Sequence, residues 1–141
     1  MTAPIYLYAI VAAAGVCGVV AAWANFNLNK RNNQFANAFG FYRRYLELCV
    51  EHSDLAEPQE KLSEGDAKYR QYEWFIGVLF RASEEVLQHC DKKEKKKWNT
   101  TVRNQLSYHA RYLRESPWLK TTGMDLYSKD LRKLIKEFQA E

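Results

Sequence analysis

The first 29 residues of this 141-residue chain contain no Asp, Glu, Lys, Arg or His, although charged residues make up 27% of the whole. The absence of these charged residues and of histidine argues against an ion site, a proton path or a voltage sensor in this segment. Between Ile5 and Trp23, only two tyrosines, two glycines and one cysteine are not plainly apolar. About 20 apolar residues are enough to cross the hydrocarbon core of a bilayer. We therefore predict that residues 1–29 form a transmembrane anchor.

Other interpretations of this segment lack the residues that they require. A secretory signal peptide begins with a positive charge, and no Lys or Arg precedes the apolar run. A lipoprotein signal has a small residue before its cysteine, whereas Val16 precedes Cys17. A buried helix of a soluble protein has one polar face, and this segment has none.

Basic residues follow the predicted span and none precedes it. Lys30, Arg31, Arg43 and Arg44 lie on its C-terminal side, where they are placed to contact anionic lipid headgroups. The positive-inside rule then places the N-terminus outside and residues 30–141 in the cytoplasm. The net charge of +4 belongs entirely to the part from Lys30 onward and is too small to indicate a nucleic-acid partner.

Small residues recur at four-residue steps within the span. Ala14, Gly18 and Ala22 fall on one line of a helix, which allows a second helix to approach closely. The predicted partner is an integral membrane protein or another copy of this chain.

Cysteine is scarce, and strict alternation of apolar and polar residues does not occur. Three cysteines are an odd number, and a cytoplasmic setting is reducing, so no disulfide is expected. Cys49 and His52, with His89 and Cys90, supply the residue types of a zinc site. Adjacent residues on a helix point about 100° apart, so His89 and Cys90 are poorly placed to share a metal. We expect no metal and no cofactor.

Apolar residues beyond the span recur every three or four positions, which predicts helices and no sheet. The expected helices cover residues 33–52, 67–90, a segment from about Asp91 that Ser116 and Pro117 end, and a last segment after Gly123. Five asparagines between positions 25 and 33 leave open whether the first helix continues through that stretch. The predicted fold class is all-α, with one transmembrane helix and a cytoplasmic bundle of about four helices. The predicted core includes Phe39, Leu46, Phe75, Leu79, Trp98, Leu106, Leu131 and Leu134.

Five lysines occur between Lys92 and Lys97. A solvated start of the third helix is the simplest interpretation of this run. However, cations at a helix N-terminus oppose the helix macrodipole. The mismatch indicates an acidic partner, either a protein or a membrane.

Arg103, Asn104 and His109 resemble the Arg-polar-x(4–6)-His motif of the HEPN ribonucleases, which are all-helical domains of similar size. The resemblance implies a site in which the Arg and the His act together on RNA, commonly across a dimer. His109 also lies on the apolar stripe of Leu106 and Leu113, which favours a packed core histidine instead.

The segments Tyr42–Pro58 and Tyr72–Leu87, with Trp98 opening the next helix, are similar to those of a group of short, uncharacterised bacterial proteins. These proteins have one membrane helix and a helical domain. The resemblance implies that fold and a single-pass position in a bacterial inner membrane, and it implies no activity. The sequence favours a non-catalytic accessory or scaffold subunit of a membrane complex. The alternative is a membrane-tethered HEPN-like ribonuclease that acts through Arg103, Asn104 and His109.

Overall fold

The computed structural model describes residues 3–58, 65–121 and 123–140, with the backbone alone for residues 3–14. These ranges form helices and turns and contain no strand, as the periodicity predicted. The elements are α1 (Ala3–Glu51), α2 (Ser53–Ala56), α3 (Ala67–His89), α4 (Lys95–Ser107), α5 (Ala110–Glu115), α6 (Pro117–Thr121), η1 (Gly123–Leu126) and α7 (Lys129–Ala140). The chain divides into an N-terminal unit, residues 1–34, and a C-terminal unit, residues 35–141.

The prediction of a transmembrane anchor at residues 1–29 is wrong for the part of the chain that the structure describes. No helix there combines the length and the apolarity that crossing a bilayer requires. Asparagines at positions 25, 27 and 29, followed by Lys30 and Arg31, come directly after Ala24 in the same helix, and these polar residues lower the apolarity of its described part.

Helix α1 continues through the asparagine-rich stretch between positions 25 and 33. Asparagine has only a modest helix penalty compared with alanine, a few tenths of a kcal/mol for each residue on average. The weak propensity of this stretch therefore does not end the helix.

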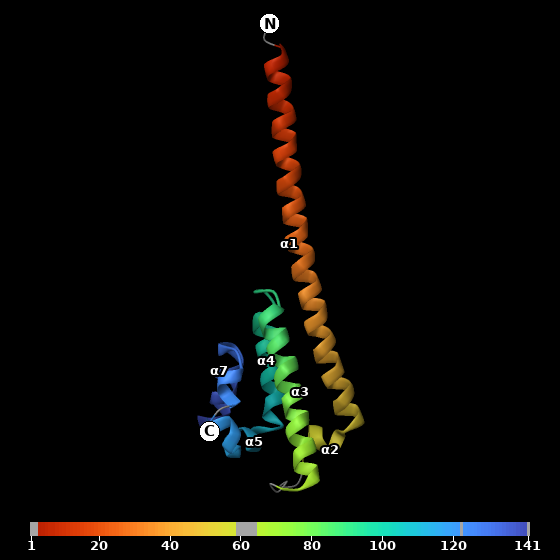
Figure 1. Ribbon diagram of the computed structural model, residues 1–141. Coiled ribbons are helices and arrows are strands. Elements are labelled where there is room, and N and C mark those ends of the chain that lie inside the picture. The colour runs from red at the N-terminus through yellow and green to blue at the C-terminus, as the bar shows by residue number, and fades with distance from the viewer. Residues whose placement is uncertain (1–2, 59–64, 122, 141) are drawn as a thin grey trace. The chain divides into compact units, whose positions relative to one another are not determined.

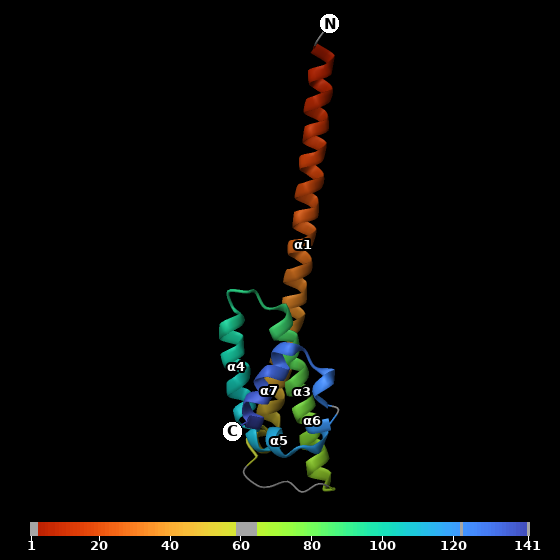
Figure 2. The ribbon, with the colours of Figure 1, turned by 90° about the vertical axis from the view of Figure 1, so that its left-hand side faces the viewer.

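The C-terminal unit buries one core among several helices. Helices α3, α4 and α7 pack pairwise, and α5 packs on α7 (Figures 1 and 2). Five of the predicted core residues are buried: Phe75, Leu79, Leu106, Leu131 and Leu134. Trp98 is half-buried, and its ring lies 5.1 Å from that of Tyr42 in an edge-to-face arrangement.

The segment of α1 in the C-terminal unit buries a different face from the one predicted. Ala38 and Tyr45 are buried, whereas Phe39 and Leu46 are 49% and 41% exposed. Both faces are apolar, so periodicity alone does not choose between them. The Tyr45 hydroxyl donates a hydrogen bond to Gln105 Oε1 at 3.0 Å. The hydroxyl therefore keeps a hydrogen-bond partner when the Tyr45 ring is buried.

The third predicted helix is two helices. Helix α4 begins at Lys95 rather than beside Asp91, and Glu94 is its N-cap residue. It ends at Ser107, and α5 begins at Ala110. Between them, His109 has φ −112° and ψ 15°, outside the helical region. The break redirects the chain while keeping Leu106, His109 and Leu113 in the core.

A buried carboxylate fixes the start of α7. Glu84 on α3 is 7% exposed, and its Oε1 accepts a hydrogen bond from the backbone N–H of Ser128, directly before the helix. Gln88 Nε2 donates to the same oxygen at 3.3 Å. Glu84 lies on the stripe of Phe80 and Leu87, and a charged residue on an apolar stripe is the sequence signal for such a role.

Candidate functional site

Arg103 and His109, the residues of the ribonuclease hypothesis, lie in different surroundings. His109 is 1% exposed, and its Nδ1 lies 2.9 Å from the Tyr72 hydroxyl in a buried hydrogen bond. Its ring also lies 5.9 Å from that of Phe75. Burial lowers the pKa of His109 to about 4, so the imidazole is neutral near pH 7. A neutral ring in the core has no access to a substrate in water.

Arg103 lies on the exposed side of α4. Its side chain is 51% exposed, and its Nη2 lies 3.1 Å from Glu137 Oε2 on α7. The neighbouring Asn104 is exposed, and its backbone carbonyl accepts a hydrogen bond from Ser107 Oγ. The structure therefore brings Arg103 to a surface and His109 to the core. The sequence feature that distinguishes them is the apolar stripe that contains His109 alone.

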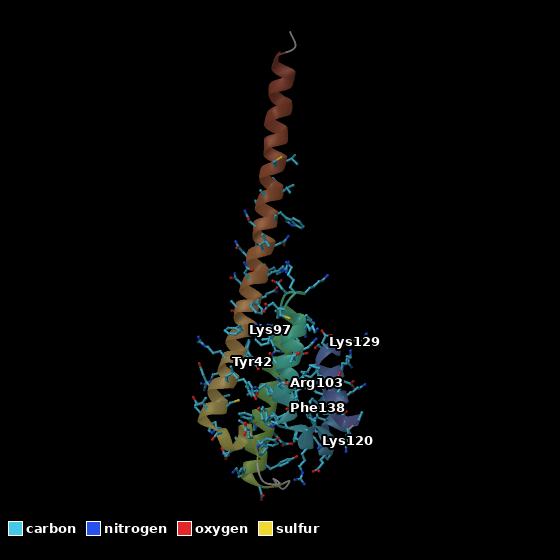
Figure 3. All side chains as sticks on the ribbon, turned by 180° about the vertical axis from the view of Figure 1, so that it is seen from behind. Tyr42, Lys97, Arg103, Lys120, Lys129 and Phe138 are labelled. Atoms are coloured by element: carbon cyan, nitrogen blue, oxygen red, sulfur yellow. The ribbon has the colours of Figure 1, made fainter. Side chains whose placement is uncertain are left out.

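A groove of about 520 Å³ lies between α4 and α7. Its first wall comes from α4 and the turn before it: Lys92, Lys95, Lys96, Asn99, Thr100 and Arg103. Its second wall comes from α7: Asp130, Lys133, Leu134 and Glu137. Figure 3 labels Arg103 on α4 and Lys129 at the start of α7, which locates the two walls.

Two ion pairs cross this groove. Lys95 Nζ lies 2.6 Å from Asp130 Oδ2 and also donates to the Leu87 carbonyl at 2.7 Å. Arg103 approaches Glu137 without hydrogen-bond geometry, because Glu137 Oε2 accepts no hydrogen bond among the described residues. The basic run at Lys92–Lys97 indicated one wall of this groove, but no periodicity paired it with α7.

The predicted helix-packing line is exposed where its side chains are described. Gly18 and Ala22 are exposed, and the side chain of Ala14 lies outside the described residues. A Cβ atom added at Gly18 would meet nothing within 4 Å. The surface of this segment is therefore free to receive a larger group without disturbing the chain itself.

The four basic residues that were assigned to a membrane surface are all exposed. Arg43 and Arg44 pair with Glu47 one turn further along α1, at 3.5 and 3.2 Å. Lys30 and Arg31 lie in the N-terminal unit. Such exposed pairs contribute little to stability, about 0.3–0.5 kcal/mol each.

No metal site forms from the side chains that the structure describes, since none of their His, Cys, Asp and Glu residues group in threes. Cys49 and Cys90 are half-buried, and burial raises the pKa of both thiols. Protonated thiols are weak nucleophiles and poor metal ligands.

No known protein family, curated protein or solved structure matches this chain.

Proposed function

We propose that this protein is a non-catalytic accessory or scaffold subunit. It assembles with a partner through the helical segment of its N-terminal unit and presents the C-terminal bundle as a binding surface. The observation that carries this proposal is the exposure of the described apolar side chains in the N-terminal unit.

Six large hydrophobic side chains of this unit are more than half exposed. They are Val16, Val19, Val20, Trp23, Phe26 and Leu28, with exposed fractions between 53% and 70%. Complete burial of one such side chain is worth about 1.5–3 kcal/mol. Contiguous exposed apolar surface of this kind is typical of an interaction site.

The small residues of the same segment support a helical partner. Gly18 and Ala22 lie four residues apart, so a partner helix is able to approach the backbone closely between the larger side chains. Close backbone approach increases the number of dispersion contacts, each of which is worth about 0.1–0.2 kcal/mol.

The surroundings of the candidate catalytic residues support a non-catalytic role. His109 is buried and neutral, and Arg103 is engaged with Glu137. The groove beside Arg103 contains lysines, carboxylates and amides, but no histidine, serine or cysteine lines it. The groove therefore resembles a binding surface more than a reaction centre.

The test compares Gly18→Leu with Gly40→Leu. Both glycines are exposed on α1, and an added Cβ meets nothing within 4 Å at either position. The full chain is cross-linked in its native cells, purified in mild detergent and analysed by mass spectrometry. We expect the wild type and Gly40→Leu to retain the same stoichiometric partner or self-association, and Gly18→Leu to lose it.

Circular dichroism provides the control for folding, because both variants should keep the helical spectrum of the wild type. If the wild type is monomeric and partner-free after cross-linking, the proposal fails. It also fails if the Gly18→Leu protein retains the complex as well as the Gly40→Leu protein does.

A further inference from the structure

The groove between α4 and α7 has an unbalanced charge. Lys95 and Arg103 are matched by Asp130 and Glu137, as described above. Three further cations, Lys92, Lys96 and Lys133, line the same groove, and none of them takes part in an ion pair among the described residues. The groove therefore holds positive charge that the fold itself does not neutralise.

The start of α4 carries two of the groove's lysines, at a position where a helix favours anions. Lys95 and Lys96 lie in the first turn, which contains no acidic residue. The N-cap residue, Glu94, makes no side-chain hydrogen bond to the helix terminus. The positive end of the helix macrodipole adds to the lysine charges. This arrangement favours a bound anion, which is the class of ligand that the excess of cations in the groove also indicates.

Two cations of the first wall follow a helical spacing. Lys96 and Arg103 lie seven residues apart on α4, with Asn99 and Thr100 between them, and Lys92 lies in the turn before the helix. Successive steps of three or four residues place side chains about 5–6 Å apart along a helix. Lys133 faces them from α7. The groove thus offers an elongated row of donors, which suits an extended ligand better than a single small anion.

The two carboxylates of the groove affect which kind of extended anion is able to bind there. Asp130 and Glu137 lie in the wall opposite Lys92 and Lys96, on either side of Lys133. A polynucleotide has a phosphate at every step and would meet both of them, with like-charge repulsion. A protein segment can place a carboxylate against each free lysine and a neutral residue against each acid. Carboxylates at i and i+4 of a partner helix form a row of negative charges that suits the row of cations in the groove.

We infer that the groove between α4 and α7 binds an acidic segment of a protein partner. The free lysines and Arg103 pair with its carboxylates, and the start of α4 adds the positive end of its dipole. This inference rests on the proposed function as an assembly subunit, because it names the chemistry of one partner. It uses a different surface from the N-terminal helical segment, so each has its own test.

The test uses the full chain and a fluorescent, alanine-based helical peptide with glutamates at i and i+4. The probe is titrated by fluorescence anisotropy at low and at moderate salt. The groove variant combines Lys92→Gln, Lys96→Gln and Lys133→Gln. Its matched control combines Arg114→Gln, Lys120→Gln and Lys136→Gln, exposed cations that do not line the groove. The two sets lower the net charge by the same amount.

We expect the groove variant to bind the glutamate peptide about tenfold more weakly, and the control to bind it like the wild type. The same peptide with glutamine in place of glutamate should not bind. An equal loss in both variants would show general charge attraction and overturn the inference. Tighter, groove-dependent binding of an oligonucleotide of equal charge would also overturn it and identify nucleic acid as the ligand.

The two proposals fail separately in these experiments. Loss of peptide binding in the groove variant, with its native complex still captured, supports the groove and leaves the N-terminal assembly intact. Failure of the wild type to bind the glutamate peptide at low salt removes the groove proposal, whatever the result for Gly18→Leu.

Discussion

Tyr72 and His109 connect α3 with the turn between α4 and α5. Their hydrogen bond is buried, and the ring of Tyr72 also meets that of Tyr112 in an edge-to-face contact at 5.5 Å. His109 Nε2 has no hydrogen-bond partner among the described residues. Protonation of this ring would place an uncompensated charge in the core, which is why burial lowers its pKa.

This buried histidine should make folding stability depend on pH. The pKa of His109 is about 4 in the folded chain and about 6.5 in the unfolded chain. The unfolded state therefore binds the proton more readily between these values. The stability contribution of the neutral ring is complete above about pH 6.5 and is lost as the pH falls towards about 4. The full loss is about 3 kcal/mol.

Carboxylates also titrate in this pH range. A comparison of the wild type with His109→Gln separates the contribution of His109 to the stability from that of the carboxylates. Glutamine retains a polar group for the Tyr72 hydroxyl and has no proton to gain. Urea denaturation at about pH 7.5 and about pH 4.5 should show the wild type losing more stability than the variant. Equal losses in the two proteins would mean that His109 does not titrate as its burial requires.

At the scale of the element, the two apolar faces of α1 differ in what they contact. Tyr42 and Tyr45 face the core, and their rings lie 5.9 Å apart. Burial raises the pKa of Tyr42 to about 12 and raises that of Tyr45 further. Phe39 and Leu46 lie beside this face and are 49% and 41% exposed, and the Phe39 ring lies 6.4 Å from that of Trp98.

Alanine substitutions test whether the side of α1 that carries Leu46 supports the fold. Leu79→Ala removes a fully buried side chain from α3 and should cost about 2–5 kcal/mol of unfolding free energy. Leu46→Ala removes a side chain that is 41% exposed and should cost less than about 1 kcal/mol. Urea denaturation of both variants with circular dichroism detection provides the values. A cost at Leu46 similar to that at Leu79 would indicate that the Leu46 side of α1 packs in the core after all.

The elements that the sequence predicts well are those with one apolar face. The pattern of α3 and α7 places Phe75, Leu79, Leu131 and Leu134 correctly, because polar residues occupy their opposite faces. The buried face of α1 was predicted wrongly because a hydrophobicity scale favours burial of phenylalanine over tyrosine. It takes no account of a hydrogen-bond partner for the tyrosine hydroxyl in the core. That preference depends on Gln105, which is distant in sequence and adjacent only in the fold.

The break after α4 could not be predicted, because no Gly or Pro marks it. Leu106, His109 and Leu113 continue the three- and four-residue spacing through the turn. The same periodicity correctly indicated that His109 is a core residue. Only one wall of the groove between α4 and α7 could be predicted from the sequence, because the lysine run is a local feature. The second wall depends on the tertiary packing of α7.

At the scale of the whole molecule, the hydrophobic core belongs to the C-terminal unit. The buried apolar residues lie between Ala38 and Phe138. Unit boundaries follow the same division, with Phe35 as the first residue of the C-terminal unit. A unit of about 100 residues is large enough to fold with its own core.

Residues 35–141 should therefore fold without the N-terminal unit. The expected result is a cooperative urea transition with the same midpoint as that of the full chain, because unfolding of the core determines both.

Fragment 47–141 tests the role of α1 in this unit. It lacks Ala38, Tyr42 and Tyr45, so Phe75 and Trp98 lose their ring contacts with α1, and its midpoint should be lower. A fragment 35–141 that fails to unfold cooperatively would show that the core requires the N-terminal unit. Equal midpoints for the two fragments would show instead that the tyrosine face of α1 contributes nothing to the core.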